Sequence, residues 1–199
     1  MKKKLILPGV VCIMVCIVGI TWYIVQTNRE PAVAFSYMYQ NSYYYSVWTI
    51  DQQGNIYRFH DNWTLTMDDY ESRKQDENCQ YIKTIDMETV KERYAFFRDI
   101  ISDRHYKKNL YVEGDINLNI FRGTKRWYGY VFNWKGEEEH ITIRDDGDQL
   151  YWSEDARMEV LADALTDLIR EEIKEYDEYC YRLKLEEFLR EEGIDHAQY

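Results

Sequence analysis

The first hydrophobic pattern of the chain is an unbroken apolar run close to its start. From Leu5 to Asn28 there is no charged side chain. About 20 apolar residues form an α-helix of roughly 30 Å, which matches the hydrocarbon core of a bilayer. Trp22 and Tyr23 close the run, and amphipathic rings of this kind favour the membrane interface. The pattern therefore predicts a single transmembrane helix, a signal anchor, over about residues 5–25.

The charges on either side of this run predict its orientation. Three lysines precede it, whereas one arginine next to one glutamate follows it. Because basic residues stay on the cytoplasmic side, we expect a membrane anchor over 1–28 with a cytoplasmic N-terminus, a linker over 29–34 and an extracytoplasmic domain over 35–199. The alternative is a signal peptide, since the small-x-small sequence ending at Ala34 is a cleavage site that would release a secreted domain beginning at Phe35.

In the first part of this domain the pattern alternates with a period of two, which is typical of strands. The runs concerned are Phe35–Gln40, Tyr43–Ile50, Asn55–His60 and Tyr81–Ile85. A short polar loop ending in Gly54 separates the second run from the third, so these two are predicted to form a hairpin. The segment Asp61–Asp76 is polar, and we expect a loop there with at most a brief strand over Trp63–Met67.

The first helix predicted within the domain begins at Asp86, a good N-cap. Val90, Tyr94, Phe97 and Ile101 follow at spacings of four, three and four, which place them on one face of a helix. We expect this helix to end at about Ser102.

A second group of strands is predicted after this helix. Residues 116–120 alternate between aliphatic side chains and asparagine, and Trp127–Phe132 and Glu139–Ile143 flank a loop that contains Gly136. The longest helical pattern follows, capped by Ser153 and free of Gly and Pro until Gly193, with a bend or second helix expected after Leu183. The fold class is thus α+β: the transmembrane helix, then a small antiparallel-sheet domain with one intermediate helix and a long C-terminal helix.

Charge excludes one class of partner. The chain of 199 residues carries a formal net charge of −11. Nucleic-acid binding requires clustered Lys and Arg to displace counterions, so we expect no nucleic acid among the partners. The expected partners are a lipid bilayer, through the N-terminal helix, and a protein or glycan.

Cysteine is scarce outside the apolar run, where only Cys79 and Cys180 occur. In an oxidising compartment two cysteines are typical of one disulfide. The alternative is two free thiols buried in the core, and the sequence does not decide between them.

No catalytic constellation emerges from the pattern. Cys79 and a histidine have no spacing that indicates nucleophilic catalysis, and the histidines lack the spacing of a zinc site. The acidic turn at 145–148 offers carboxylates to Ca²⁺, but such turns are commonly rich in Asp and Gly for conformational reasons. We therefore expect no metal and no cofactor, and we name no catalytic residue.

Aromatic residues are the unusual feature of the composition, with 19 tyrosines and six tryptophans. Tyr and Trp are enriched at interfaces, but they also fit the half-buried surface of a sheet. The candidate contact face that the strand segments offer consists of Tyr43, Tyr45, Trp127, Tyr128 and Tyr130. The sequence thus favours a membrane-tethered, non-catalytic binding module for a protein or a glycan. The alternative is a secreted or cell-envelope hydrolase with an acidic active site that the pattern does not locate.

Overall fold

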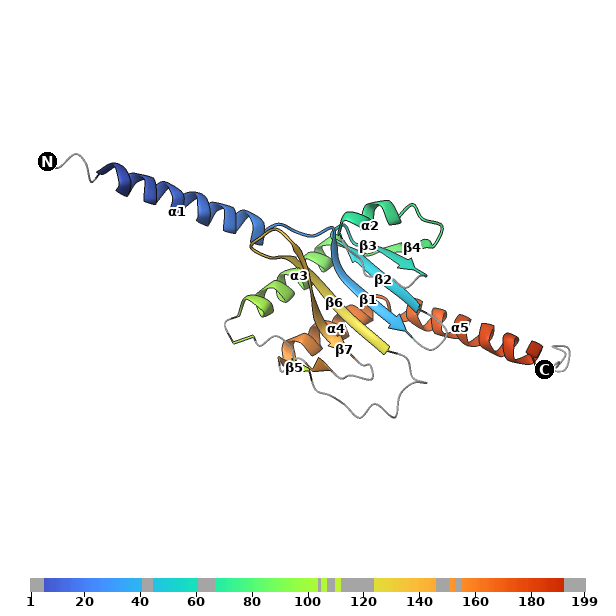
Figure 1. Ribbon diagram of the computed structural model, residues 1–199. Coiled ribbons are helices and arrows are strands. Elements are labelled where there is room, and N and C mark those ends of the chain that lie inside the picture. Colours follow the sequence, from blue (N-terminus) through green and yellow to red (C-terminus); the bar gives the residue numbers. More distant parts are fainter. Residues whose placement is uncertain are drawn as a thin grey trace.

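The computed structural model describes residues 6–40, 45–60, 67–103, 105–106, 110–111, 124–145, 151–152 and 155–191 (Figure 1). The described elements, in chain order, are α1 (Ile6–Thr27), β1 (Val33–Gln40), β2 (Tyr45–Asp51), β3 (Asn55–Phe59), α2 (Met67–Arg73), β4 (Cys79–Thr84), α3 (Met87–Ser102), β5 (Leu110–Tyr111), β6 (Thr124–Phe132), β7 (Glu138–Asp145), β8 (Tyr151–Trp152), α4 (Ala156–Leu168) and α5 (Arg170–Glu191). The predicted α+β class is confirmed.

The described strands form one antiparallel sheet in the order β4-β3-β2-β1-β6-β7-β8-β5. The first four strands pair in sequence as a meander, and β1 joins this meander to β6, with Phe35 opposite Gly129. Gly129 has no side chain because the ring of Phe97 from α3 occupies that space: an added Cβ would lie 2.4 Å from a ring carbon.

The predicted hairpin is confirmed as β2 and β3, and its turn has a clear physical cause. Asp51 Oδ1 accepts hydrogen bonds from the backbone N–H groups of Gln53 and Asn55, at 3.0 and 2.8 Å. Gly54 adopts a φ of +85°, which an L side chain rarely tolerates. This turn fixes the register that places Trp48 of β2 opposite Arg58 of β3.

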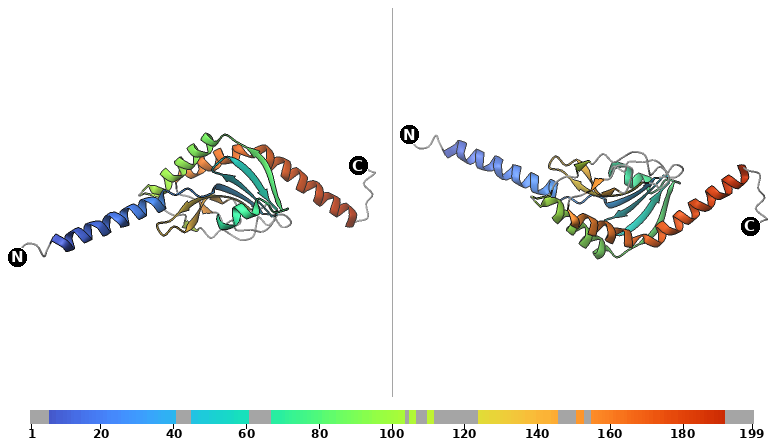
Figure 2. Two further views of the ribbon diagram at one scale, coloured as in Figure 1. Left: turned by 90° about the horizontal axis from the view of Figure 1, so that it is seen from above. Right: turned by 90° about the horizontal axis from the view of Figure 1, so that it is seen from below.

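Helices α3, α4 and α5 cover one face of the sheet, whereas α2 lies on the other face (Figure 2). The helix α3 is the predicted intermediate helix, and its N-cap is Asp86, whose carboxylate accepts from the backbone N–H of Thr89. The core between these helices and the sheet includes Phe35, Trp48 and Trp127. A smaller cluster around Tyr70 of α2 packs on the opposite face.

One predicted helical feature is wrong, and one helix was not predicted. The long C-terminal helix is interrupted at Ile169, which leaves the helical conformation at φ −128° and ψ 17° and is itself fully buried. Since the sheet twists, this break lets α4 pack on β7 while α5 turns to place Tyr176 against Trp48 of β2. The helix α2 was not predicted, because its seven residues hold only two apolar side chains, Met67 and Tyr70, too few to show a helical period. Of the brief strand expected over Trp63–Met67, only Met67 lies within the described residues, and it begins this helix.

The predicted transmembrane helix and signal anchor are also corrected. The chain is helical over Ile6–Thr27, but within the described part of the chain no helix has the length and apolarity needed to cross a membrane.

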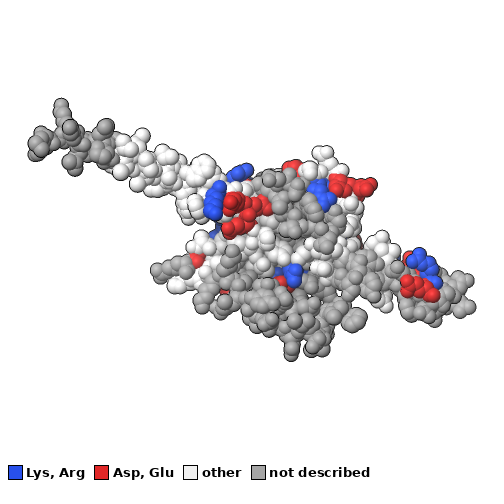
Figure 3. Space-filling model, in the orientation of Figure 1, with Lys and Arg blue, Asp and Glu red and all other residues white. Residues whose placement is uncertain are grey.

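The described part of α1 projects from the domain as an uncharged surface (Figure 3). Just beyond the helix, the guanidinium carbon of Arg29 lies 4.4 Å from the ring centroid of Phe132 on β6. The extracytoplasmic location of the domain and the contact with a bilayer stay predictions. Residues 116–120, expected to form a strand, lie outside the described residues, as does all of the 145–148 turn except Asp145.

Candidate functional site

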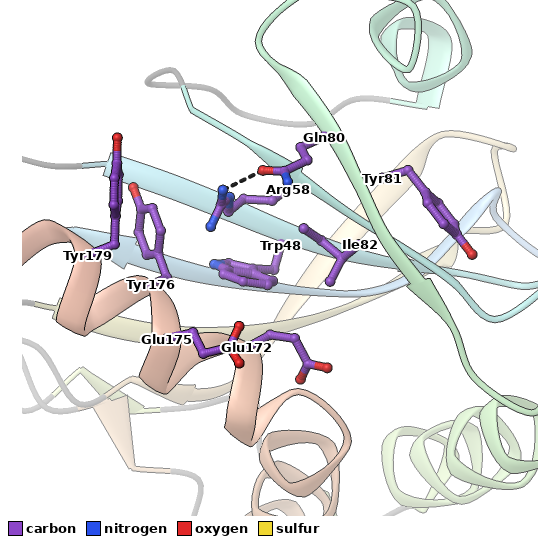
Figure 4. A pocket seen from close by; sticks show the side chains of 9 residues that line it. All are labelled: Trp48, Arg58, Gln80, Tyr81, Ile82, Glu172, Glu175, Tyr176 and Tyr179. Carbon is purple, nitrogen blue, oxygen red and sulfur yellow. Dashed lines mark hydrogen bonds between the residues drawn. The ribbon is translucent and has the colours of Figure 1, made fainter.

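A cavity of about 480 Å³ lies between α5 and the outer strands of the sheet (Figure 4). Residues from β2, β3, β4 and α5 line it: Trp48, Arg58, Gln80, Tyr81, Ile82, Glu172, Glu175, Tyr176 and Tyr179. Its lining is mainly polar, with the ring of Trp48 and the side chain of Ile82 as its apolar part.

Strand register brings the sheet side of the cavity together. Trp48 lies opposite Arg58, and Arg58 lies opposite Gln80, so one side chain from each of three neighbouring strands points to the same face. Spacings of three and four residues along α5 place Glu172, Glu175, Tyr176 and Tyr179 on the facing side of the helix (Figure 4).

Arg58 is enclosed at the base of the cavity. Its guanidinium carbon lies 4.4 Å from the ring centroid of Tyr176 and 5.2 Å from that of Trp48. Nη2 of Arg58 donates a hydrogen bond to Oε1 of Gln80. Burial lowers the pKa of Arg58, while Tyr176 and Cys180 act in the opposite direction. Burial also raises the pKa of the Tyr176 hydroxyl, so this hydroxyl is protonated at neutral pH.

The enclosure of Arg58 determines which aromatic surface is accessible. The side chains of Trp48 and Tyr176 are 1 % and 5 % exposed, and the guanidinium of Arg58 covers a face of each ring. The exposed ring at the cavity is that of Tyr179, at 48 %, because the ring of Tyr81 points away from the cavity (Figure 4). The mouth of the cavity therefore offers ring surface, whereas its base does not.

Two carboxylates belong to the helix side of the cavity. Glu172 forms an ion pair with Lys83 of β4 through Oε1, and its Oε2 is buried without a hydrogen-bond partner among the described residues. Glu175 is exposed, and no described residue is paired with it. Both carboxylates come from the same turn of one helix, so they do not flank a bound substrate as the acid pair of a glycosidase does.

An open sheet edge borders this cavity. Among the described strands, β4 pairs with β3 alone. The backbone N–H of His60 donates to the carbonyl of Asn78 at 3.2 Å. Because hydrogen-bonded and non-hydrogen-bonded pairs alternate along an antiparallel ladder, the pair Arg58–Gln80 is bonded and the pair Tyr57–Tyr81 is not. The backbone N–H and C=O of Tyr81 therefore point away from β3, toward the open edge.

The aromatic residues expected to form a contact face are mostly packed inside the domain. Trp127 is buried, and its Nε1–H donates to Oγ1 of Thr166 at 3.0 Å. Tyr130 is buried on the opposite face of β6, where its hydroxyl bonds to Oγ of Ser36 at 2.8 Å. The two rings thus serve the two hydrophobic clusters rather than one exposed surface.

The remaining members of that set are two half-buried rings and one residue outside the described range. The hydroxyl of Tyr45 donates to Sδ of Met38, and Tyr128 packs edge-on against His140 with ring centroids 5.4 Å apart. Tyr43 lies outside the described residues. The structure therefore does not bring the described members of the set together as an exposed face.

The two cysteines of the domain are free thiols in the structure. Cys79 is half-buried beside the cluster on the α2 side of the sheet, whereas Cys180 lies in the main core on the α3–α5 side. Asp145 of the acidic turn is paired with Arg126, with 2.8 Å between Oδ2 and Nε. Within the described residues no group of His, Cys, Asp or Glu is arranged to hold a metal.

Comparison of the chain with protein-family models, with characterised proteins and with solved structures gives no significant match. Assignment of the site therefore depends on its geometry. The sequence analysis did not identify Arg58, Gln80, Glu175 or Tyr179 as residues of a site. The hairpin turn at Gly54 could have indicated part of it, because the turn sets which residues of the two strands lie opposite each other. Counting back and forward from that turn pairs Trp48 with Arg58.

Proposed function

We propose that the domain is a non-catalytic binding module that captures an extended segment of a partner protein at the open edge of β4. The observation that carries this proposal is the outward-pointing backbone of Tyr81 beside the 480 Å³ cavity. An extended peptide that pairs with an exposed strand gains main-chain hydrogen bonds, and adjacent pockets for alternate side chains give specificity.

A short segment fits this edge better than a long one. The β3–β4 ladder changes register between Ile56 and Tyr57, and a bulge of this kind twists an edge strand. Lys83 on the same strand also disfavours pairing with a long flat strand. The stretch Cys79–Ile82 is therefore the part of β4 that a peptide of a few residues can follow.

A protein partner is favoured over a glycan by the state of the aromatic rings. Proteins that bind sugars commonly stack an accessible ring face on the pyranose, but Arg58 covers the faces of Trp48 and Tyr176 that it meets in the cavity. The hydrolase alternative is less well supported, since both cavity carboxylates lie on one side of the cavity.

The test is an array of random seven-residue peptides probed with the intact protein, followed by NMR titration of the best binder. The Tyr81 amide points to solvent in the free protein, so we expect its hydrogen exchange to slow when the peptide binds. Tyr81→Pro removes this one outward N–H without removing a ladder bond to β3. We expect Tyr81→Pro to weaken binding about tenfold, whereas Tyr81→Thr, which keeps the N–H, binds within about twofold.

Binding that leaves the Tyr81 amide unprotected and is unaffected by Tyr81→Pro would contradict strand addition. Binding of a soluble glycan array in place of the peptides, with the same amides unaffected, would replace the peptide with a sugar as the ligand. Circular dichroism of Tyr81→Pro and Tyr81→Thr establishes that both variants retain the fold.

A further inference from the structure

The mouth of the cavity differs in charge from its base. Arg58 lies at the base, enclosed by Trp48 and Tyr176, and Lys83 of β4 is paired with Glu172. Glu175 remains exposed at the mouth, with no partner among the described residues. The charge that a ligand meets first is therefore negative.

An exposed aromatic ring lies one helical turn beyond this carboxylate on α5. Tyr179 follows Glu175 by four residues on α5, so both side chains project from the same side of the helix. The ring of Tyr179 is 48 % exposed. A carboxylate and an exposed ring one helical turn apart suit a long basic side chain, whose cation gains a charge-assisted hydrogen bond from the first and a cation–π contact from the second.

We infer that the peptide captured at β4 carries a lysine or arginine whose side chain contacts Glu175 and Tyr179. This inference rests on the proposed function and adds the chemical class of the recognised residue. The overall charge of −11 acts in the same direction, because it raises the local concentration of basic segments near the domain.

Strand geometry also assigns the position of that residue. Directly opposite residues of a ladder point to the same face of the sheet. The side chain of Gln80 points into the cavity, toward α5, whereas that of Tyr81 points away from it (Figure 4). The basic residue of the peptide is therefore the one opposite Gln80, and the residue opposite Tyr81 carries no such requirement.

The experiment uses three blocked peptides of the form Thr-Val-Thr-X-Thr-Val-Thr, in which X is Lys, Gln or Glu. Fluorescence anisotropy measures their binding to the intact protein at low and high salt. We expect the Lys peptide to bind about tenfold more tightly than the Gln peptide and the Glu peptide to bind most weakly. The difference in affinity between the Lys and Gln peptides should decrease as the salt concentration is raised, because the contact is at the surface and is screened by salt.

Protein variants identify the carboxylate concerned. In Glu175→Gln we expect the dissociation constants of the Lys and Gln peptides to differ by no more than about twofold. In Glu175→Lys we expect the Glu peptide to bind most tightly. Glu178→Gln is the matched control, because it makes the same charge change on an exposed residue of α5 that does not line the cavity. We expect this control to retain the tenfold preference.

The outcomes separate the inference from the proposed function. If the three peptides bind equally and protect the Tyr81 amide, the strand-addition proposal holds and the basic preference is wrong. If the Lys preference survives in Glu175→Gln, the assigned carboxylate is wrong. If none of the three peptides binds while the array of seven-residue peptides also yields no binder, the proposed function itself fails.

Discussion

The guanidinium carbon of Arg58 lies 4.4 Å from the ring centroid of Tyr176, and this contact joins strand β3 to helix α5. The two residues are far apart in the sequence, and each is packed against Trp48 of β2 as well. A cation–π contact contributes roughly 0.5–2 kcal/mol, depending on desolvation. The stack therefore helps to hold α5 in place, together with the ion pair of Lys83 and Glu172, and so contributes to the shape of the cavity.

Replacing Arg58 tests this relationship. We expect Arg58→Ala to lower the free energy of unfolding by about 1–3 kcal/mol, because it removes both ring contacts and leaves Oε1 of Gln80 without its donor. Urea unfolding followed by tryptophan fluorescence measures the change. Arg182→Ala, on the exposed side of α5, serves as control and is expected to change stability by less than about 0.5 kcal/mol. Equal effects of the two variants would contradict the stacking role.

Gly129 is expected to tolerate no side chain while Phe97 is present. An alanine Cβ would lie 2.4 Å from the Phe97 ring, so Gly129→Ala should destabilise the fold by about 1–3 kcal/mol through overpacking. Combining it with Phe97→Leu relieves the clash, and the double variant should cost less than the sum of the two single changes. Thermal unfolding of the four proteins measures this coupling. Additive effects would show that the two positions do not meet.

The cap of α3 should make stability sensitive to acid. Hydrogen bonds from Thr89, first from its backbone N–H and then from its side chain, lower the pKa of Asp86 below its ordinary value of 3.8. Because the pKa of Asp86 is lower in the folded than in the unfolded state, its ionised carboxylate stabilises the fold above pH 3.8. This stabilisation is lost as the pH falls through the pKa of Asp86 in the folded protein. Asp86→Asn keeps the capping oxygen but removes the charge, so this part of the acid sensitivity should disappear.

Thermal unfolding between pH 2 and pH 6 measures that difference. As the pH falls below about 4, the unfolding temperature of the wild-type protein should fall more than that of Asp86→Asn. At higher pH the two unfolding temperatures should change in parallel. Other carboxylates keep their own acid sensitivity in both proteins, so their contribution cancels in the comparison. A constant difference at every pH would contradict the assignment to Asp86.

The thiols of Cys79 and Cys180 should remain unbridged under oxidising conditions. They lie in two separate clusters, and burial raises the pKa of the Cys79 thiol, which lowers the thiolate fraction needed for oxidation. We expect slow alkylation of both in the native protein and complete alkylation after denaturation without reductant. A loss of two mass units in the intact protein, with both cysteines protected after denaturation, would establish the bridge instead.

Local patterns account for the elements that were predicted correctly. The hairpin of β2 and β3 follows from the Asp51–Gly54 turn, and α3 follows from its Asp86 cap and a buried face that begins at Val90. Both depend on interactions within a few residues, which a single sequence contains. The break at Ile169 is different, because it is imposed by the twist of a sheet built from strands elsewhere in the chain.

The candidate site was harder to predict for the same reason. Arg58 reads in the sequence as a polar residue on the outer face of a strand, and only the packing of α5 against β2 and β3 encloses it. Trp127 and Tyr130, which were predicted to belong to a contact face, are instead packed in the two hydrophobic clusters. The exposed ring at the site is Tyr179, on a helix rather than on a strand.

The pairing of β1 with β6 also sets a sequence of events during synthesis. Strands β1 to β4 are complete at Thr84, whereas β6 begins at Thr124, so the ribosome finishes the meander well before the partner of β1 emerges. Until then β1, which is buried along most of its length in the finished sheet, is an apolar edge open to mispairing. The interval between these two strands is therefore when the nascent chain is most exposed to aggregation.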